Sequence, residues 1–237
     1  MANIKKAMIL SAGLGTRLRP LTASTPKPLI PVAGQASLLR TLDTLAHCGI
    51  EEVVVNTHHL ADQVEDAVQQ YKGPITIHIS HETHLLETGG GVRQALQWLG
   101  EQEPFLVVNG DIVWSEKQTP LLTQLMSQFD AGPMDVKLAV SKIDAVVSPR
   151  KGGDFVLNEN QQAFFPLENQ TADYVYMGVN IMHPRVVLSL PKGEAFSLVN
   201  VWRDCAAKGT LFAYPYQGKW ADMGTPEGLA AANQLMS

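Results

Sequence analysis

Short apolar runs alternate along the chain with stretches in which apolar residues recur every three or four positions. The runs predict buried strands, and the longer-period stretches predict amphipathic helices. Strands and helices alternate over the first half of the chain, which favours a parallel sheet covered by helices on both faces. The strands expected are Ala7–Leu10, Glu52–Asn56, Ile75–Ser80, Phe105–Asn109, Val136–Val140, Phe155–Leu157, Val175–Met182 and Leu211–Tyr216.

Helices are expected between these strands and at the end of the chain. Thr225 followed by Pro226 is typical of a cap and first helical residue, and predicts a helix from there onward. The polar, glycine-rich stretch 148–170 predicts a hairpin and a mobile loop. The fold class expected is therefore α/β: a three-layer, Rossmann-like domain around a doubly wound, mixed and mainly parallel sheet. The other helices expected are Leu38–Cys48, Leu60–Gln70, Gly91–Leu99 and Thr119–Gln128.

Composition narrows the class of protein. The chain has 237 residues and is 45% hydrophobic, which suits one domain over residues 1–237. No apolar run is long enough to span a membrane, and the first ten residues are too mixed for a signal peptide. Cys48 and Cys205 are isolated, as expected of thiols in a reducing compartment. We therefore expect a cytoplasmic protein without a membrane partner.

Charge is distributed unevenly. The net charge of −5 argues against a general nucleic-acid-binding surface. Residues 1–42 nevertheless contain six Lys or Arg and no Asp or Glu, which leaves −11 for the remainder. Three of these cations, Arg17, Arg19 and Lys27, surround a glycine-rich loop. An anionic ligand at this loop would explain the asymmetry.

The loop after the first strand has the composition of a phosphate-binding segment. Gly13 and Gly15 allow backbone N–H groups to approach a phosphate, Arg17 offers a forked donor pair, and Lys27 offers a compact charge. No acidic residue of this segment competes for the cations. A dinucleotide fingerprint would need glycine in place of Leu18, and the Gly-Lys-Ser/Thr of a P-loop is absent. The prolines predict a stiff, extended segment; they are Pro20, Pro26, Pro28 and Pro31.

The run from Gly13 to Thr22, followed by Pro26-Lys27-Pro28, resembles the signature of nucleoside-triphosphate sugar-1-phosphate nucleotidyltransferases. The resemblance implies that Arg17 holds the departing phosphates and that Lys27 is the main catalytic cation at the α-phosphate. It implies a nucleoside triphosphate and a sugar 1-phosphate as substrates. The nucleotide would bind residues 1–112 and the sugar residues 113–237. The loop residues expected against the nucleotide are Ala12, Gly13, Gly15 and Thr16.

Two aspartates are candidates for metal binding. Asp111 follows the apolar strand Phe105–Asn109, at whose carboxyl end a ligand is expected in such a sheet. A carboxylate that faces phosphates requires a cation between them, and Mg²⁺ prefers this combination. On local grounds alone, Asp111 is equally typical of a turn or cap residue, and Asp222 is more typical of a loop residue that contacts its own backbone. The family resemblance, which extends to the Trp-x-Asp-x-Gly-Thr segment around Asp222, implies that both hold Mg²⁺.

The segment from Ser80 to Gly91 resembles the part of the family that contacts the base and ribose. Glu82 would accept the ring N–H of uracil, although it suits guanine equally. Gly89 and Gly90 would lie against the nucleotide; on the residues alone they also fit a plain helix entry. A zinc site is not expected, because the histidines lie on different predicted elements; they are His58, His59, His81 and His84.

The acceptor sugar is expected in the second half of the chain. Many relatives carry a Glu-Lys-Pro segment whose lysine binds the sugar phosphate, and this chain has Phe165-Pro166-Leu167 in that place. Arg150, Lys151 or the metal is expected to take over this contact. On the residues alone, Asp154 and Asn180 also fit ordinary turn or strand-edge positions. The resemblance implies that the sugar-binding residues are Asn109, Asp154, Gly178 and Asn180.

A sugar phosphate is already largely dianionic near neutral pH, so its attack on the α-phosphorus needs no general base. The substrates expected from the resemblance are UTP and N-acetylmuramic acid 1-phosphate. The first alternative is GTP with mannose 1-phosphate, and the second is a homologue that senses nucleotide without turnover. An NAD-dependent oxidoreductase ranks last. The sequence carries no signal for an oligomeric state.

Overall fold

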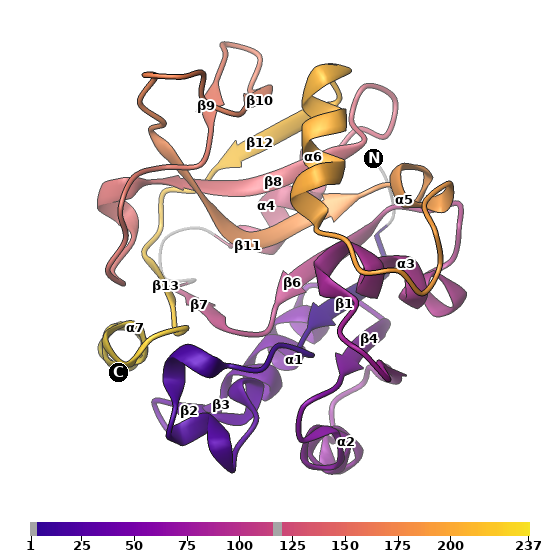
Figure 1. The fold of residues 1–237 in the computed structure, drawn as a ribbon, viewed down its shortest axis with the longest axis vertical. Coiled ribbons are helices and arrows are strands. Elements are labelled where there is room, and N and C mark those ends of the chain that lie inside the picture. The colour runs from indigo at the N-terminus through magenta and orange to yellow at the C-terminus, as the bar shows by residue number, and fades with distance from the viewer. Residues whose placement is uncertain (1–3, 116–119) are drawn as a thin grey trace.

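A seven-stranded sheet forms the centre of the computed structural model, which describes residues 4–115 and 120–237 (Figure 1). All neighbouring strands are parallel except that β11 runs antiparallel to both of its neighbours. The sheet is therefore mixed and mainly parallel, as the sequence predicts. Its strands, in spatial order, are β12 (Leu211–Pro215), β8 (Val136–Lys142), β11 (Tyr174–Met182), β6 (Phe105–Asn109), β1 (Lys6–Leu10), β4 (Glu52–Thr57) and β5 (Thr76–His81).

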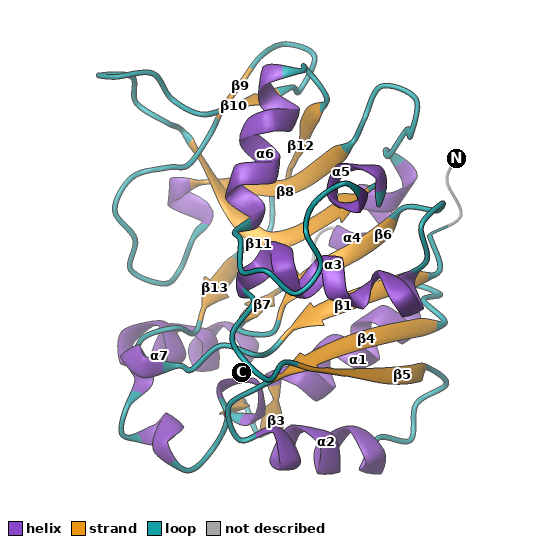
Figure 2. Cartoon of the chain, turned by 45° about the vertical axis from the view of Figure 1, so that its right-hand side comes forward, coloured by secondary structure: helices purple, strands orange, loops and turns teal. Residues whose placement is uncertain are grey.

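Helices cover both faces of this sheet. Neighbouring residues of β1 point to opposite faces, so that Ala7 and Ile9 join one apolar cluster and Met8 joins the other. The two views place α3, α5 and α6 in front of the sheet and α1 and α4 behind it (Figure 1, Figure 2). The three-layer α/β prediction is confirmed. The helices are α1 (Ser37–His47), α2 (Ala61–Gln70), α3 (Glu87–Leu99), α4 (Leu121–Ser127), α5 (Arg185–Leu188), α6 (Leu198–Ala207) and α7 (Pro226–Met236).

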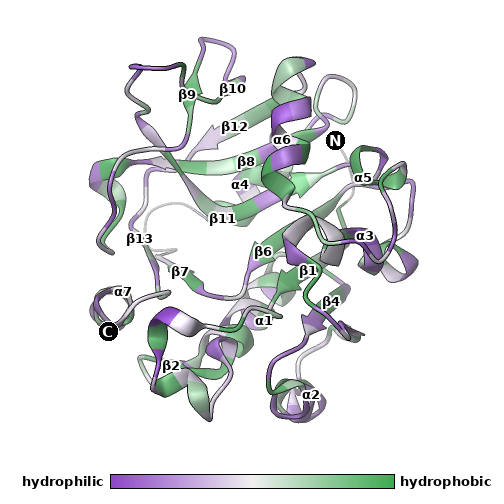
Figure 3. Cartoon of the chain, in the orientation of Figure 1, coloured by the Kyte–Doolittle hydropathy of each residue, from purple (hydrophilic) through white to green (hydrophobic). Residues whose placement is uncertain are grey.

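Strands β1, β6 and β8 are largely apolar and buried. Figure 3 shows hydrophobic residues along β1, β6 and β8, whereas α6 carries hydrophilic residues on part of its surface. Within the described ranges, no helix combines the length and apolar character needed to cross a lipid bilayer. Thr119, where the sequence predicts the start of a helix, lies outside the described residues.

The proline-rich segment after β1 is wound into turns, and the prediction of an extended chain is wrong. Three short 3-10 helices occupy Thr16–Leu18, Leu21–Ala23 and Lys27–Leu29. Proline lacks an N–H, but the first residues of a helical turn need no such donor, so Pro20 and Pro28 fit where they lie. The turns bring Lys27 back toward the sheet. Two short paired strands follow, β2 (Pro31–Val32) and β3 (Gln35–Ala36).

A second small ladder brings the end of the chain to the sheet. The sequence places Asp222 in a turn, whereas it ends β13 (Trp220–Asp222), which pairs antiparallel with β7 (Ile112–Trp114). Thr225 caps α7 through a hydrogen bond from Gly228 N to its hydroxyl, as expected from the sequence. Helices α5 and α6 are additions to the expected elements. The predicted hairpin is confirmed by β9 (Val156–Leu157) and β10 (Ala163–Phe164).

Lys137, on β8, is a buried lysine and gives a pH-dependent stability. Its Nζ donates to the carbonyl oxygen of Gln128 at 2.8 Å, and burial lowers its pKa from 10.5 to about 8. Below pH 8 the lysine is protonated in both states, and the folded state carries the full cost of burying the charge. As the pH rises from 8 toward 10.5, only the folded form has lost its proton, so stability rises.

We therefore expect Lys137→Met to unfold at a higher temperature than the wild type at neutral pH. The difference between the two midpoints should shrink as the pH is raised through the window above, because the wild type sheds its charge there. Differential scanning calorimetry of both proteins at a series of pH values measures this difference. A difference between the two unfolding midpoints that stays constant with pH would contradict the lowered pKa of Lys137.

Candidate active site

Two cavities open at the carboxyl ends of β1 and β6. The first, which we call the loop cavity, has a volume of about 390 Å³ and lies against the loop that follows β1. Leu10 pairs with Asn109 at the ends of the two parallel strands, so the segments that follow them meet at one edge of the sheet. The predicted site residues that line the loop cavity are Ala12, Gly13, Gly15, Thr16, Arg17, Lys27, Glu82, Asn109 and Asp111.

The second cavity, which we call the aromatic cavity, has a volume of about 570 Å³. It shares Arg17, Asn109 and Asp111 with the loop cavity, so the two cavities meet at these residues. The predicted sugar-binding residues Asp154 and Gly178 line it. Its walls also carry aromatic side chains and further arginines that the sequence did not single out as a group; these lining residues are Arg150, Phe155, Phe165, Tyr176, Trp202, Arg203 and Trp220.

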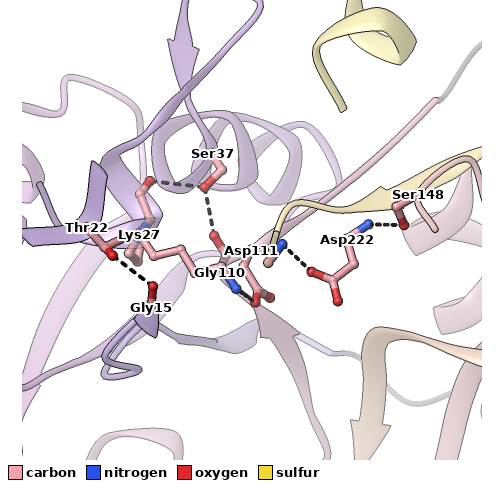
Figure 4. A network of polar contacts seen from close by, with 10 residues as sticks. Gly15, Thr22, Lys27, Ser37, Gly110, Asp111, Ser148 and Asp222 are labelled. Carbon is pink, nitrogen blue, oxygen red and sulfur yellow. Dashed lines mark hydrogen bonds and ion pairs between the residues drawn. The ribbon is translucent and has the colours of Figure 1, made fainter. Parts of the chain in front are cut away.

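An ion pair between Lys27 and Asp111 lies where the cavities meet (Figure 4). The two side chains are 11% and 26% exposed, so the pair is shielded from bulk water. The sequence gives Lys27 no nearby acidic competitor, but the fold supplies one from the end of β6, some 84 positions later. A ligand phosphate at Lys27 or a cation at Asp111 would compete with this contact. The pair holds both groups in place without a ligand.

Asp222 lies beside this ion pair. Met223 N donates to the backbone oxygen of Asp111 at 3.0 Å, and Gly224 N donates to Asp222 Oδ1 at 2.6 Å. A Cβ atom added to Gly224 would lie 2.7 Å from both Arg17 Nη2 and Asp222 Oδ1, and 3.1 Å from Lys27 Nζ. Two cations and a carboxylate thus surround Gly224, and Figure 4 shows Asp222 next to Asp111.

The donor set fits Mg²⁺. The ion takes one or two carboxylates and completes its shell with water and substrate phosphates, and Asp111 and Asp222 offer two carboxylates on a shared cavity wall. Over residues 4–115 and 120–237, no cluster of three or more His, Cys, Asp or Glu could hold a metal on its own.

Buried hydroxyls fix the segments around the ion pair. Ser37 Oγ lies 2.7 Å from Gly110 O and 3.1 Å from Pro28 O, which links the Lys27 segment to the loop that carries Asp111. Thr22 Oγ1 donates to Gly15 O at 2.8 Å and closes the glycine loop (Figure 4). These contacts hold the cations in position before a ligand arrives.

Glu82 is tied into the framework. It is 1% exposed, and its two oxygens accept from Asn56 Nδ2 at 2.7 Å and from Leu86 N at 2.9 Å. Asn56 Oδ1 in turn accepts from Ser11 N at 2.7 Å. The network joins the glycine loop to the segment predicted to bind the base. Asn56, at the end of β4, was missed because no local pattern marks it.

Gly89 and Gly90 are not brought to the loop cavity. Both lie inside α3, where a Cβ on Gly89 would fall 2.4 Å from the Phe196 ring and one on Gly90 would fall 2.3 Å from Glu194 O. Gly89 N also donates to Phe196 O at 2.8 Å. These glycines allow a backbone segment of the protein, rather than a ligand, to approach the helix. The lining of the loop cavity reaches Thr88 but neither glycine, and their contact with the nucleotide stays a prediction.

The four predicted sugar residues are placed differently. Gly178 has φ +77° at a β-bulge of β11, which only glycine adopts readily. Asp154 accepts from Tyr176 N at 2.9 Å and pairs with Arg150.

Asn180 is fully buried and donates to Tyr176 Oη at 2.8 Å. Asn180 lines neither cavity. Its hydrogen bond positions Tyr176, which does line the aromatic cavity and whose pKa is raised by burial. Asn109 lines both cavities.

Residues 6–237 match the family model described as nucleotidyl transferase. The chain therefore belongs to the nucleotidyltransferase family, and it is a nucleotidyltransferase of the sugar-1-phosphate class. It is 36% identical to an N-acetylmuramate alpha-1-phosphate uridylyltransferase of Caulobacter vibrioides, with 98% of this chain and 97% of that protein covered. A second relative, from Dictyostelium discoideum, is named mannose-1-phosphate guanylyltransferase catalytic subunit beta. It is 30% identical, with 94% of this chain and 62% of that protein covered.

Solved structures support the Rossmann-like fold. A putative glucose-1-phosphate thymidylyltransferase from Bacillus anthracis superimposes with a TM-score of 0.79, and 97% of this chain and 94% of that chain are covered. The two sequences are 20% identical, so this likeness concerns the fold alone.

Proposed function

We propose that the protein transfers uridine monophosphate from UTP to N-acetylmuramic acid 1-phosphate, giving the UDP-sugar and pyrophosphate in the recycling of cell-wall sugars in the cytoplasm. The observation that carries the transfer reaction is the convergence of Arg17, Lys27 and Asp222 on Gly224, beside Asp111. The near full-length likeness to the Caulobacter vibrioides uridylyltransferase supports this sugar and this base.

The loop cavity would hold the triphosphate and the aromatic cavity the sugar. Arg17, which lines both, would bind the phosphates that leave, and Lys27 would exchange Asp111 for the α-phosphate. The acceptor phosphate is already ionised and needs no base, so the protein's task is to align the two substrates and neutralise charge. Asp111 and Asp222 would hold Mg²⁺, which when bound would offset the negative charge of the phosphates.

A panel of substrates tests the proposal. UTP, GTP, CTP and dTTP are each combined with N-acetylmuramic acid, mannose, glucose and N-acetylglucosamine 1-phosphates, with Mg²⁺ present and pyrophosphate release as the readout. We expect the highest kcat/KM for UTP with N-acetylmuramic acid 1-phosphate. A preference for GTP with mannose 1-phosphate would replace this assignment with the alternative suggested by the second relative. Nucleotide binding without turnover of any pair would favour a sensor.

A further inference from the structure

Helix α6 turns one face toward the aromatic cavity. Val199, Trp202 and Arg203 stand at positions i, i+3 and i+4, which share one face of a helix, and all three line the cavity. The hydroxyl of Ser197 accepts a hydrogen bond from Val199 N at 3.2 Å and caps the helix at this end. Arg203 therefore enters the cavity wall from a regular element whose position is fixed.

The guanidinium of Arg203 stacks on an aromatic ring. Its central carbon lies 4.3 Å from the centroid of Phe165, whose ring is in turn 4.9 Å from that of Phe155. A guanidinium that stacks on a ring through its flat face can still donate hydrogen bonds from the N–H groups at its edge. Across the described part of the chain, Arg203 has no hydrogen bond or ion pair to the protein. It is an exposed cation on the cavity wall whose N–H groups are not committed to another part of the described protein.

The other arginines of this cavity have different surroundings. Arg150 is paired with Asp154, so its charge is compensated within the protein. Arg17 approaches Gly224 together with Lys27, where the transferred phosphate is expected. Arg203 shares the wall with Phe165 and Trp202 instead. A sugar 1-phosphate whose phosphate lay against the α-phosphate at Lys27 would leave Arg203 for a second anionic group.

We propose that Arg203 binds a carboxylate carried by the acceptor sugar and so makes the enzyme selective for acidic sugar 1-phosphates. This inference rests on the proposed function, because it takes the aromatic cavity as the acceptor site. The edge of a guanidinium donates two parallel hydrogen bonds to a carboxylate. A neutral sugar offers no anion for this edge. Phe165 is a positioning residue, because its ring lies against the central carbon of the guanidinium.

Two pairs of acceptors that differ in a carboxylate test the proposal. N-acetylmuramic acid 1-phosphate is compared with N-acetylglucosamine 1-phosphate, and glucuronic acid 1-phosphate with glucose 1-phosphate, all with UTP. The wild type should favour the acidic member of at least one pair. Arg203→Gln should raise KM for that acid by about ten- to a hundredfold and leave KM for its neutral partner and both kcat values unchanged. Arg203→Lys should restore part of the preference, because it keeps the charge but not the fork.

Lys208→Gln is the matched control. Lys208 is an exposed cation at the end of the same helix that lines neither cavity, so its loss should alter neither acceptor. Equal losses on acidic and neutral acceptors in Arg203→Gln, or no loss on either, would overturn the proposal. So would a wild type that prefers the neutral member of both pairs. In that case turnover of the neutral sugars would leave uridylyl transfer standing, whereas no turnover of any acceptor would count against the proposed function itself.

Discussion

Lys27→Met is expected to lower kcat/KM by about a thousandfold, the upper range for removing one group that stabilises a charged transition state. Methionine keeps much of the length of the apolar stem and removes the charge. The variant should still fold, because Ser37 continues to link Pro28 and Gly110 when the ammonium group is gone. The measurement is initial-rate kinetics with saturating Mg²⁺, accompanied by the thermal midpoint of each protein.

Two control variants distinguish the effect of the lost charge from the effect of a changed side-chain shape. Lys27→Arg keeps the positive charge with a different shape and should retain more activity than Lys27→Met. Lys5→Met removes a surface lysine that pairs with Glu51 away from both cavities, and should match the wild type in kinetics. Near-normal activity of Lys27→Met would contradict the role assigned to Lys27.

The loops that carry Arg17 and Asp111 could be placed together from the sequence, because of a general rule of parallel sheets. Strands β1 and β6 are buried on both faces and therefore appear as continuous apolar runs, which makes them easy to predict. The loops after such strands meet at the carboxyl edge. That rule alone brings Arg17 and Asp111 to one place, where both line the same cavity.

The position of Asp222 depends on a pairing that sequence does not reveal. Strands β7 and β13 have three residues each, too few to show an alternating pattern, and about a hundred positions separate them. Without this ladder, Asp222 remains an ordinary turn residue. The family resemblance therefore carried the prediction, and the pairing of Asp222 with Ile112 supplies its physical reason.

Two further features of the site could not be predicted from the sequence: which group approaches a glycine closely, and which side chains stack on one another. A row of glycines shows that something must come near the backbone, but it does not say whether a ligand or another segment does so. At Gly89 and Gly90 the answer is the segment that carries Phe196. Likewise, Arg203 meets Phe165 from a distant part of the sequence, and neither residue carries a local pattern that would mark the contact.

Asp111→Asn and Asp222→Asn are each expected to lower kcat/KM by about a thousandfold, because losing a carboxylate of the proposed metal site would forfeit several kcal/mol of charge stabilisation. Asparagine keeps an oxygen that can still accept from Gly224 N, so the turn after Asp222 should persist. Each variant should need a much higher Mg²⁺ concentration for half-maximal rate. Asp144→Asn, which alters an exposed acid outside both cavities, should behave as the wild type.

Stability of the same variants provides a readout that does not depend on turnover. In Asp111→Asn, the largely buried ammonium of Lys27 loses its partner, and this should destabilise the fold. Adding Lys27→Met removes the stranded charge, so the double variant should be more stable than the sum of the single effects predicts, by about 0.5–3 kcal/mol. Urea unfolding of the four proteins measures this coupling. Additive effects would mean that the ion pair does not form in solution, and a magnesium requirement unchanged by Asp111→Asn would remove Asp111 from the metal site.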